Sequence, residues 1–359
     1  MRVLMVCSTF PGPRKRRCGV GDYTQKLVEY LQKGGIDVAV FDAVSTEKVL
    51  FSAQEQACSL IHWQYHPRTY GEKLGGYLLG IRNRRAPGRL PFLATMHTVR
   101  DAHLDSLLRS MFARIGADHL LFTNQYDARK ATIPLLLPGR KRTVCPVGPT
   151  IEPSPSADRD RRAEFGFPSD SFLISSFGFL NRGKGVPHLL QAMLRVRQRV
   201  KNAFLALIGE IRDESRPLEQ EMRSLAKELG LEDCIRWLGD LSDEEVSKLL
   251  VSSDVYVLSF AEGVSTKRTT LMCGLAHGTP LITTRSKDKA FPLRCGQQLE
   301  CVPRNDPEAL AQRIVDLSAN PQRREALGKA ALASAGEFSW ERIAQDHIRL
   351  YQHLVQEAR

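Results

Sequence analysis

Residues 259–280 combine a carboxylate, hydroxyl groups and glycine directly after an apolar run that is typical of a buried strand. The loop consists of Glu262, Gly263, Val264 and Ser265. A helix is expected to begin near Thr266 or Lys267, and the free N–H groups of a helix N-terminus favour anionic ligands. The stretch therefore predicts a site for phosphate oxygens and sugar hydroxyls. The alternative is that Glu262 only caps the helix.

A second loop, residues 178–185, places two cations beside flexible backbone between a predicted strand and a predicted helix. Arg182 can bind a phosphate through two parallel N–H groups, whereas Lys184 acts as a point charge. This combination predicts a diphosphate site. The alternative is a surface turn that carries two ordinary cations.

Gly19 and Gly21 lie in a third loop, residues 18–24, which opens a predicted helix at 22–33. Glycines at such a position let the backbone approach an anionic or sugar ligand. Asp42 stands where a dinucleotide fold carries its ribose-binding acid, but the connection after the first strand is too long for the tight turn of that fold. An NAD-dependent oxidoreductase is therefore the least favoured alternative.

Polar or aromatic residues follow two buried strands that we predict at 59–63 and 91–95. Tyr65 belongs to the first of these clusters and His97 to the second. Ligands of parallel sheets bind beyond the carboxyl ends of the strands. Both side chains are therefore candidates for the site.

Apolar runs alternate with helical patterns along the chain, which predicts βαβ units and parallel sheets. In the first half, strands are expected at 2–7, 37–41, 59–63, 91–95, 119–123 and 143–146, with a helix at 22–33. In the second half, strands are expected at 172–177, 203–208, 235–238, 254–259 and 280–284, with helices at 186–200 and 218–229 and a capping box at Ser242 and Glu245. The segment 148–157 is rich in proline and serine, so we predict one domain at 1–150 and another at 151–337.

The composition excludes several classes of protein. With 42% hydrophobic and 25% charged residues, the chain is expected to fold as a globular protein. No apolar run approaches the roughly 20 residues of a membrane span. Eight scattered cysteines without a C-x-x-C pair predict reduced thiols and no zinc site. These features predict a cytoplasmic protein, with peripheral contact at the inner membrane surface as an open alternative.

The net charge of +11 arises entirely from the first half. Residues 1–150 hold 22 Lys and Arg against 11 Asp and Glu, whereas the remainder has 29 of each kind. This excess predicts an anionic partner for the first half. The cations concerned are Arg14, Lys15, Arg16, Arg17, Arg82, Arg84, Arg85 and Arg89. No nucleic acid is expected, because no known nucleic-acid module accompanies them.

The order of these motifs resembles family-4 glycosyltransferases over essentially the whole chain. The matching features are the glycine loop after the first strand, His97 after the fourth, the Lys184-Gly185 turn, the Glu262-Gly263 loop with its following Ala-x-Gly-x-Pro-like turn, and the tail Phe338-Ser339-Trp340-Glu341. The resemblance implies an α/β protein of the GT-B fold, with two Rossmann-like doubly wound domains facing a central cleft. It also implies a C-terminal helix at about 338–359 that packs back on the first domain.

The resemblance implies that the first domain binds the acceptor and the second binds a nucleotide sugar. His97, Glu262 and Lys184 would be the catalytic residues. The donor would be bound by Gly19, Gly21, Arg182, Lys184, Gly239, Leu241, Glu262, Gly263, Val264, Ser265 and Thr270. The acceptor would be bound by Arg14, Lys15, Arg16, Arg17, Tyr65 and His97.

Two positions depart from the family pattern. Phe179 stands where the family carries an arginine, so Arg182, Lys267 or Arg268 would have to supply the second diphosphate cation. Thr270 stands at the second family glutamate, which normally holds the nucleotide ribose. A neutral hydroxyl binds a ribose more weakly than a carboxylate does. The sequence therefore leaves the base and the sugar of the donor open.

The resemblance implies transfer of a sugar, with retention of configuration, from a nucleoside diphosphate sugar to a hydroxyl acceptor that is anionic or lipid-linked. No metal or other cofactor is expected, because Lys184, Arg182 and a helix N-terminus would stabilise the charge of the leaving diphosphate. Two alternatives stay open besides the NAD enzyme. One is a sugar-nucleotide epimerase of the same fold, which needs no acceptor. The other is a non-catalytic protein that binds sugar nucleotides or polysaccharides.

Overall fold

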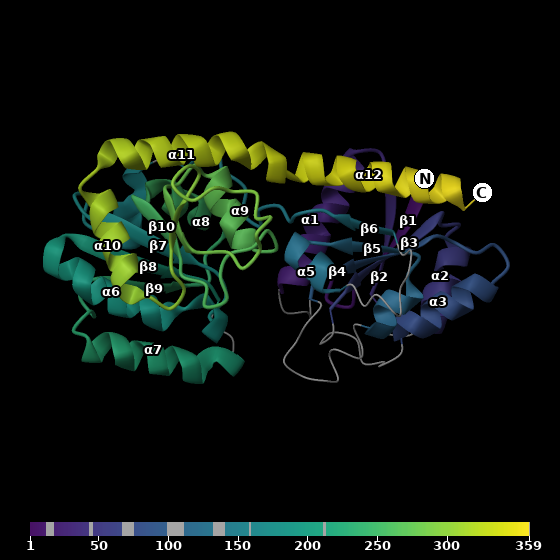
Figure 1. Cartoon of the computed structure of the whole chain (residues 1–359), viewed down its shortest axis with the longest axis horizontal. Coiled ribbons are helices and arrows are strands. Elements are labelled where there is room, and N and C mark those ends of the chain that lie inside the picture. The colour runs from purple at the N-terminus through teal and green to yellow at the C-terminus, as the bar shows by residue number, and fades with distance from the viewer. Residues whose placement is uncertain are drawn as a thin grey trace. The chain divides into compact units, whose positions relative to one another are not determined.

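The computed structural model describes residues 1–11, 18–42, 46–66, 75–98, 111–131, 141–157, 159–210 and 213–358. The chain divides into two compact units (Figure 1). The first comprises Met1–Gly148 together with Phe338–Arg359, and the second comprises Pro149–Glu337. The division lies within two residues of the sequence-based boundary at 150, and the last helix belongs to the first unit.

The first unit contains a six-stranded parallel sheet in the order β2-β1-β3-β4-β5-β6. Its strands are β1 (Arg2–Val6), β2 (Asp37–Phe41), β3 (Leu60–Tyr65), β4 (Phe92–Met96), β5 (His119–Phe122) and β6 (Lys141–Val144). Its helices include α1 (Gly19–Lys33), α2 (Thr46–Glu55), α3 (Gly75–Arg85), α5 (Gln125–Lys130) and α12 (Trp340–Glu357). The six predicted strands are confirmed, with ends shifted by at most two residues.

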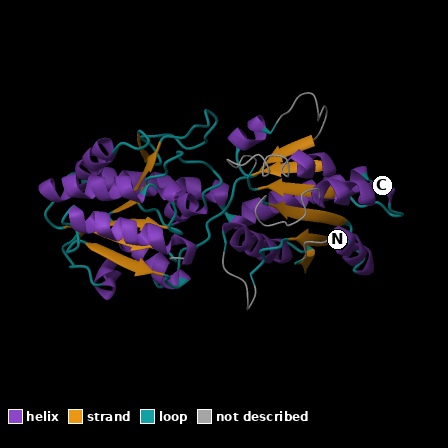
Figure 2. Cartoon of the chain, turned by 90° about the horizontal axis from the view of Figure 1, so that it is seen from below, coloured by secondary structure: helices purple, strands orange, loops and turns teal. Residues whose placement is uncertain are grey.

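The second unit contains another six-stranded parallel sheet, in the order β12-β11-β10-β7-β8-β9. Its strands are β7 (Phe172–Phe177), β8 (Ala203–Ile208), β9 (Ile235–Gly239), β10 (Val255–Leu258), β11 (Leu281–Thr284) and β12 (Glu300–Val302). Its α-helices are α6 (Val186–Arg199), α7 (Arg216–Glu228), α8 (Asp243–Ser252), α9 (Thr269–Ala276), α10 (Pro307–Ser318) and α11 (Pro321–Ala335). Figure 2 shows the strands of each unit surrounded by helices. Both units are therefore doubly wound α/β structures.

The strand order reverses once in each sheet, between β1 and β3 in the first and between β7 and β10 in the second. Loops after the two strands at such a point diverge to opposite faces and leave room for a ligand. In the second unit these are the two loops that the sequence singles out, residues 178–185 and 259–268. In the first unit they follow β1 and β3.

Two helix starts differ from the sequence-based expectation. The helix α1 begins at Gly19 rather than near residue 22, because the Cys18 thiol accepts a hydrogen bond from the Gly21 N–H at 3.2 Å and caps it. The helix α9 begins at Thr269 rather than near residue 266, and the side chain of its N-cap residue, Arg268, makes no capping hydrogen bond. Glu262 lies near Arg268, which gives no support to the alternative that it only caps this helix. By contrast, the capping box of Ser242 and Glu245 at the start of α8 is confirmed.

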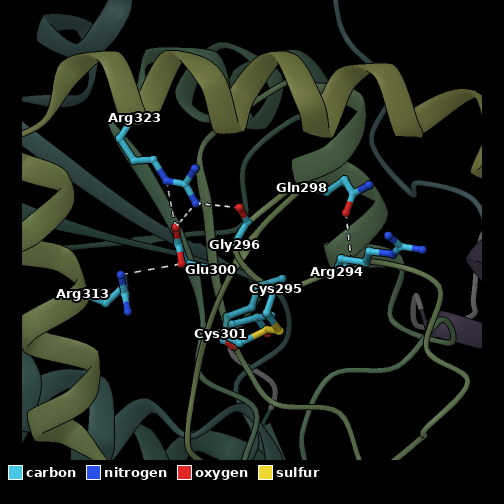
Figure 3. Close-up of a disulfide and its surroundings, with 10 residues drawn as sticks. Arg294, Cys295, Gly296, Gln298, Glu300, Cys301, Arg313 and Arg323 are labelled. Atoms are coloured by element: carbon cyan, nitrogen blue, oxygen red, sulfur yellow. Dashed lines mark hydrogen bonds and ion pairs between the residues drawn. A yellow bond between two sulfur atoms is a disulfide. The ribbon is translucent and has the colours of Figure 1, made fainter.

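The expectation of eight reduced thiols is wrong for one pair. Cys295 and Cys301 form a disulfide, with their Cα atoms 5.3 Å apart, between the loop after β11 and the strand β12 (Figure 3). Between them the chain turns back at Gly296, and Glu300 pairs with Arg323. The sequence concealed this pair because a reversal over six residues leaves no spacing pattern. The six other cysteines are free thiols.

No helix among the described residues is both long enough and apolar enough to cross a membrane.

Candidate functional site

Lys184 is the central cation of the second unit. Its Nζ atom lies 3.4 Å from the carbonyl oxygen of Phe177 and 3.4 Å from Oγ1 of Thr270. Burial, together with repulsion from Arg268, lowers the pKa of this ammonium group to about 7. The structure pairs no carboxylate with Lys184 within the described part of the chain. A partly buried ammonium group with only neutral acceptors can gain much from an anionic ligand.

Arg268 is a second cation beside Lys184. Its guanidinium carbon lies 4.7 Å from the centroid of the Phe260 ring, and Nζ of Lys184 lies 5.2 Å from the same centroid. Arg268 also reaches Glu262, whose Oε2 atom is 3.8 Å from Nη2. The Glu262 side chain is 71% exposed and can contact a ligand. Of the three candidates for the missing family cation, the structure brings Arg268 next to Lys184.

Phe260 is a site residue that sequence reasoning missed. It is fully buried at the end of β10, and the two cations share its ring. Each cation is attracted to the electron-rich ring face, which offsets part of their mutual repulsion. An aromatic residue two positions before Glu262, in the run from the strand to the loop, was the available signal.

The two loops are held together by main-chain contacts. The Ser259 hydroxyl donates to the carbonyl oxygen of Lys184 at 3.0 Å, and the Ala261 N–H donates to Gly183 at 3.1 Å. Gly178 has φ of 130°, and a Cβ atom there would lie 2.3 Å from Nζ of Lys184. The positive φ and this close approach both favour glycine beside the ammonium group.

A pocket of about 440 Å³, including space open to solvent, lies at the carboxyl ends of β7, β8 and β9. Lys184 lines this pocket together with Gly178, Gly209, Trp237 and Gly239. Sequence reasoning missed Trp237 and predicted Gly239 as a donor-binding residue. The pocket thus connects the predicted diphosphate cation Lys184 with the predicted donor-binding residue Gly239, and its lining is mostly apolar or main chain, as in many ligand sites.

The loop before α9 supplies backbone and hydroxyl groups. Val264 is buried, and its N–H donates to Thr284 at 3.2 Å, while Gly263 packs against the carbonyl group of Arg285. The Oγ atom of Ser265 is buried and has no hydrogen-bond partner among the described residues. Because an unpaired buried hydroxyl costs free energy, this atom favours a ligand that pairs with it.

Thr270 lies inside the second unit rather than on its surface. It is 7% exposed, and its carbonyl oxygen accepts a hydrogen bond of 3.0 Å from Tyr256. Its hydroxyl faces Lys184. A glutamate here would stand beside the ammonium group, so the threonine leaves Lys184 without that partner.

Gly19 and Gly21 occupy the first turn of α1. A Cβ atom at Gly21 would lie 2.2 Å from the carbonyl oxygen of Thr9, so the close approach of these two backbones requires glycine there. A Cβ atom at Gly19 would meet nothing within 4 Å. Of the two glycines, only Gly19 therefore has open space beside its backbone.

His97 follows β4 directly and is partly buried. Its Nε2 atom lies 2.8 Å from Oε1 of Gln64, and its ring packs edge-on against Tyr23 at 4.9 Å between centroids. Burial lowers the pKa of the imidazole to about 3, so the ring is neutral at physiological pH. Tyr65 lies within β3 rather than after it, 2% exposed and edge-on to Trp63. This position gives no support to a role in acceptor binding.

Several predicted cations lie elsewhere. Arg14, Lys15, Arg16 and Arg17 are outside the described residues. Arg182 is paired with Glu221 of α7 at 2.9 Å, and its side chain is 77% exposed. Arg84 and Arg89 approach Asp118 at 3.8 and 2.9 Å, whereas Arg82 and Arg85 lie exposed on α3. Leu241 lies in the turn after β9. Among the described residues, no three His, Cys, Asp or Glu side chains are arranged to hold a metal ion.

Each unit contains a parallel sheet whose strand order reverses once, and in the second unit Lys184 and Arg268 follow the two strands at that reversal. These features define the class of protein: the chain has the two-domain GT-B fold of glycosyltransferases. The family described as glycosyl transferases group 1 matches residues 158–333, nearly the whole second unit. The second unit thus matches that family, and together with the named relatives below this identifies the chain as a glycosyltransferase. The D-inositol 3-phosphate glycosyltransferase of Corynebacterium jeikeium is 26% identical over 97% of this chain and 84% of its own length. Two other curated relatives are matched over 52% and 53% of their length.

Solved structures agree on the fold. A sucrose-phosphate synthase from Thermosynechococcus elongatus superposes with a TM-score of 0.81, at 18% identity and 99% coverage of both chains. HepE of Anabaena, solved with UDP and glucose, gives a TM-score of 0.78 at 17% identity, over 98% of this chain and 100% of its own. At these identities the likeness concerns the fold alone.

Proposed function

We propose that this glycosyltransferase takes its sugar from a nucleoside diphosphate sugar and transfers it, with retention of configuration, to a hydroxyl acceptor. The observation that carries the proposal is the pair of cations around Phe260. Lys184 and Arg268 lie beside a pocket that reaches Gly239, and Lys184 has only neutral partners. A diphosphate attached to a base would place its charge and its ring at the two ends of this arrangement.

The chemistry follows from charge. The bond between the anomeric carbon and the diphosphate oxygen breaks, and its electron pair stays on that oxygen. The acceptor oxygen bonds to the anomeric carbon on the same face, and its proton passes to the leaving phosphate. Lys184 and Arg268 stabilise the negative charge that grows on the diphosphate, and groups aimed at such developing charge are the largest contributors in many enzymes. These two cations supply the countercharge, so we propose no metal or other cofactor.

The remaining groups orient the sugar. The exposed Glu262 carboxylate accepts hydrogen bonds from sugar hydroxyls, and the unpaired Ser265 hydroxyl donates to a phosphate or sugar oxygen. Holding the reacting atoms in one geometry itself lowers the barrier to the reaction. Phe179 stands where the family carries a cationic arginine. Arg268, rather than Arg182, supplies the second cation in its place, which explains how the chain tolerates Phe179.

We propose an anionic acceptor, either a phosphate ester or a lipid-linked phosphate. Arg82 and Arg85 give α3 an exposed positive surface. The curated relative from Corynebacterium jeikeium is named for a phosphorylated acceptor, D-inositol 3-phosphate. A lipid-linked acceptor would bring the protein to a membrane surface peripherally, since clustered cations are attracted to anionic lipids.

The test begins with a thermal-shift screen against UDP, GDP, ADP, TDP and CMP and their sugar conjugates. We expect one nucleoside diphosphate to raise the melting temperature, since a ligand at 100 times its dissociation constant adds about 2.7 kcal/mol. Lys184→Met is expected to lower kcat/KM by about 100-fold to 1,000-fold, the usual cost of removing one group that stabilises a developing anion. The rate of nucleoside diphosphate release is measured for the native protein and for the variant.

Lys201→Met is the matched control, because Lys201 is exposed on the turn after α6. Full activity of Lys184→Met would contradict the assignment of the donor site. Turnover of the nucleotide sugar without any acceptor would favour the epimerase, and binding without turnover would favour the non-catalytic protein.

A further inference from the structure

Two polar side chains lie in the middle of a fully buried strand. His62 is 0% exposed and Gln64 is 1% exposed, and both belong to β3. Successive side chains of a strand point to opposite faces, so His62 and Gln64 share one face. The alternate residues Ile61, Trp63 and Tyr65 join the apolar cluster on the other face. Buried polar groups of this kind must be paired.

These two residues belong to a chain of hydrogen bonds that ends at His97. The Tyr351 hydroxyl of α12 lies 2.6 Å from Nδ1 of His62. The Nε2 atom of His62 lies 3.1 Å from Nε2 of Gln64, and Oε1 of Gln64 lies 2.8 Å from Nε2 of His97. The chain thus runs from α12 through β3 to the loop after β4.

The position of Met5 fixes the direction of every bond in this chain. The Gln64 Nε2 atom donates to the Met5 sulfur at 3.1 Å, and a thioether can only accept. The amide nitrogen of Gln64 therefore faces His62, whose Nε2 atom accepts from it and from the Thr95 hydroxyl at 2.7 Å. Nδ1 of His62 then carries the proton and donates to Tyr351. The amide oxygen of Gln64 faces His97, whose Nε2 atom must carry the proton.

We propose that Gln64 is the positioning residue of His97. Its amide oxygen holds the imidazole as the Nε2–H tautomer and leaves the Nδ1 lone pair to accept a hydrogen bond from a substrate hydroxyl. The part that concerns the substrate rests on the proposed function, whereas the tautomer does not. A histidine whose other nitrogen is fixed in this way presents one defined acceptor.

The surroundings keep the imidazole groups neutral. Burial lowers the pKa of His97 to about 3 and that of His347, on α12, to about 4, and it lowers the pKa of His62 as well. Burial raises the pKa of Tyr23, whose ring lies against His97. Burial also raises the pKa of Tyr351, so neither tyrosine adds a negative charge. His66 repels a proton on His97. A neutral His97 has one proton to place, and Gln64 decides where.

Long-range ¹H–¹⁵N spectra of the histidine side chains test the proposal directly, because they distinguish a protonated from an unprotonated ring nitrogen. Signals of His97 are assigned by their loss in His97→Ala. In the native protein we expect Nε2 protonated and Nδ1 unprotonated. In Gln64→Leu we expect a mixture of tautomers, with kcat for diphosphate release lowered by about 10-fold to 100-fold. The Michaelis constant for the nucleotide sugar chosen in the screen should hardly change.

Gln64→Glu keeps an acceptor toward His97 and is the rescuing variant. It should retain the Nε2–H tautomer and recover most of kcat. Its carboxylate should also raise the pKa of His97, so a new loss of rate is expected on the acid side of the pH profile. Gln56→Leu is the control for the loss of a glutamine, because the side-chain amide of Gln56, just after α2, donates to the nearby Ser52 hydroxyl.

An unchanged tautomer in Gln64→Leu overturns the proposal. If Gln64→Leu does not fold, Gln64→Glu decides it through the pKa of His97: no rise in that pKa and no new loss of rate on the acid side overturn the proposal. A changed tautomer with unchanged turnover overturns the role of His97 in the proposed function and leaves the positioning by Gln64 in place.

Discussion

The candidate residues of the two units are held in place by different physical means. In the first unit, His97 is neutral and is tied to Gln64, His62 and Tyr351 by hydrogen bonds between buried uncharged groups. In the second unit, Lys184 and Arg268 share the ring of Phe260, and Lys184 contacts only weak acceptors. The first arrangement is satisfied internally, whereas the second lacks an anion.

This difference separates positioning from binding. A satisfied neutral network contributes rigidity and is insensitive to pH, because its imidazole groups have lowered pKa values. Burial destabilises the charged form of Lys184, so its protonation depends strongly on pH and on the presence of an anionic ligand. Changes in the second unit are therefore expected to alter donor affinity, and changes in the first unit to alter rate or stability.

The largest expected effect is the pH dependence of donor affinity. The pKa of Lys184 is lowered to about 7, and only the charged ammonium group attracts the diphosphate. Donor affinity should be highest below pH 7 and fall by up to about 100-fold between pH 7 and pH 9. Above the pKa, the protonated fraction of Lys184 falls about tenfold with each pH unit. Calorimetric titration with a nucleotide sugar, whose esterified diphosphate does not titrate in this range, measures the effect.

Lys184→Met should remove this pH dependence, and an equally steep profile in the variant would contradict its origin in Lys184. The stability of the free protein should show the opposite trend. Between pH 7 and pH 10.5 the unfolded chain binds the proton that folded Lys184 has lost, so this group contributes increasing stability as pH rises. Unfolding in urea, compared between the native protein and Lys184→Met, measures that contribution.

A smaller effect is expected for Gly178→Ala. The new Cβ atom would stand 2.3 Å from Nζ of Lys184, so the ammonium group must move away from its place beside Thr270. Donor affinity should fall by about 10-fold, in line with a misplaced rather than missing group. The positive φ of 130° adds a strain of order 1–3 kcal/mol, which lowers the melting temperature.

Gly230→Ala separates strain from displacement. Gly230 also has a positive φ, 65°, but a Cβ atom there would meet nothing within 4 Å. It should lower stability and leave donor affinity unchanged. Equal affinities of the two variants would show that the place of Lys184 is unimportant.

The smallest expected effect concerns the far end of the neutral network. Tyr351→Phe removes the acceptor of the His62 Nδ1–H group and leaves a buried donor unpaired, at a cost of about 1–3 kcal/mol. Donor affinity should not change, because no charge is altered. Chemical unfolding measures the loss, with Tyr77→Phe on α3 as the control. A loss of donor affinity in Tyr351→Phe would contradict the separation of the two regions.

Much of the fold was predictable from the sequence because each strand is a local apolar run. The first strands of both units were placed within one residue, and the Ser242–Glu245 capping box was recognised from its spacing. The strand β12 escaped because it has three residues, and the helices α10 and α11 were not predicted although Pro307 and Pro321 stand at their first positions. Short elements depend on tertiary contacts rather than on their own pattern.

The sequence by itself determined the types of chemistry present, namely two glycine-rich loops with cations and a carboxylate, because residue type and distance from a strand end are local properties. Only the tertiary structure decided which groups meet. It turned Arg182 toward Glu221, brought Arg268 to Lys184 across Phe260, and joined Tyr351 to His62 over 289 positions of the chain. Such pairings depend on the order of the strands in the sheet and on the return of the last helix, and neither leaves a signal in neighbouring residues.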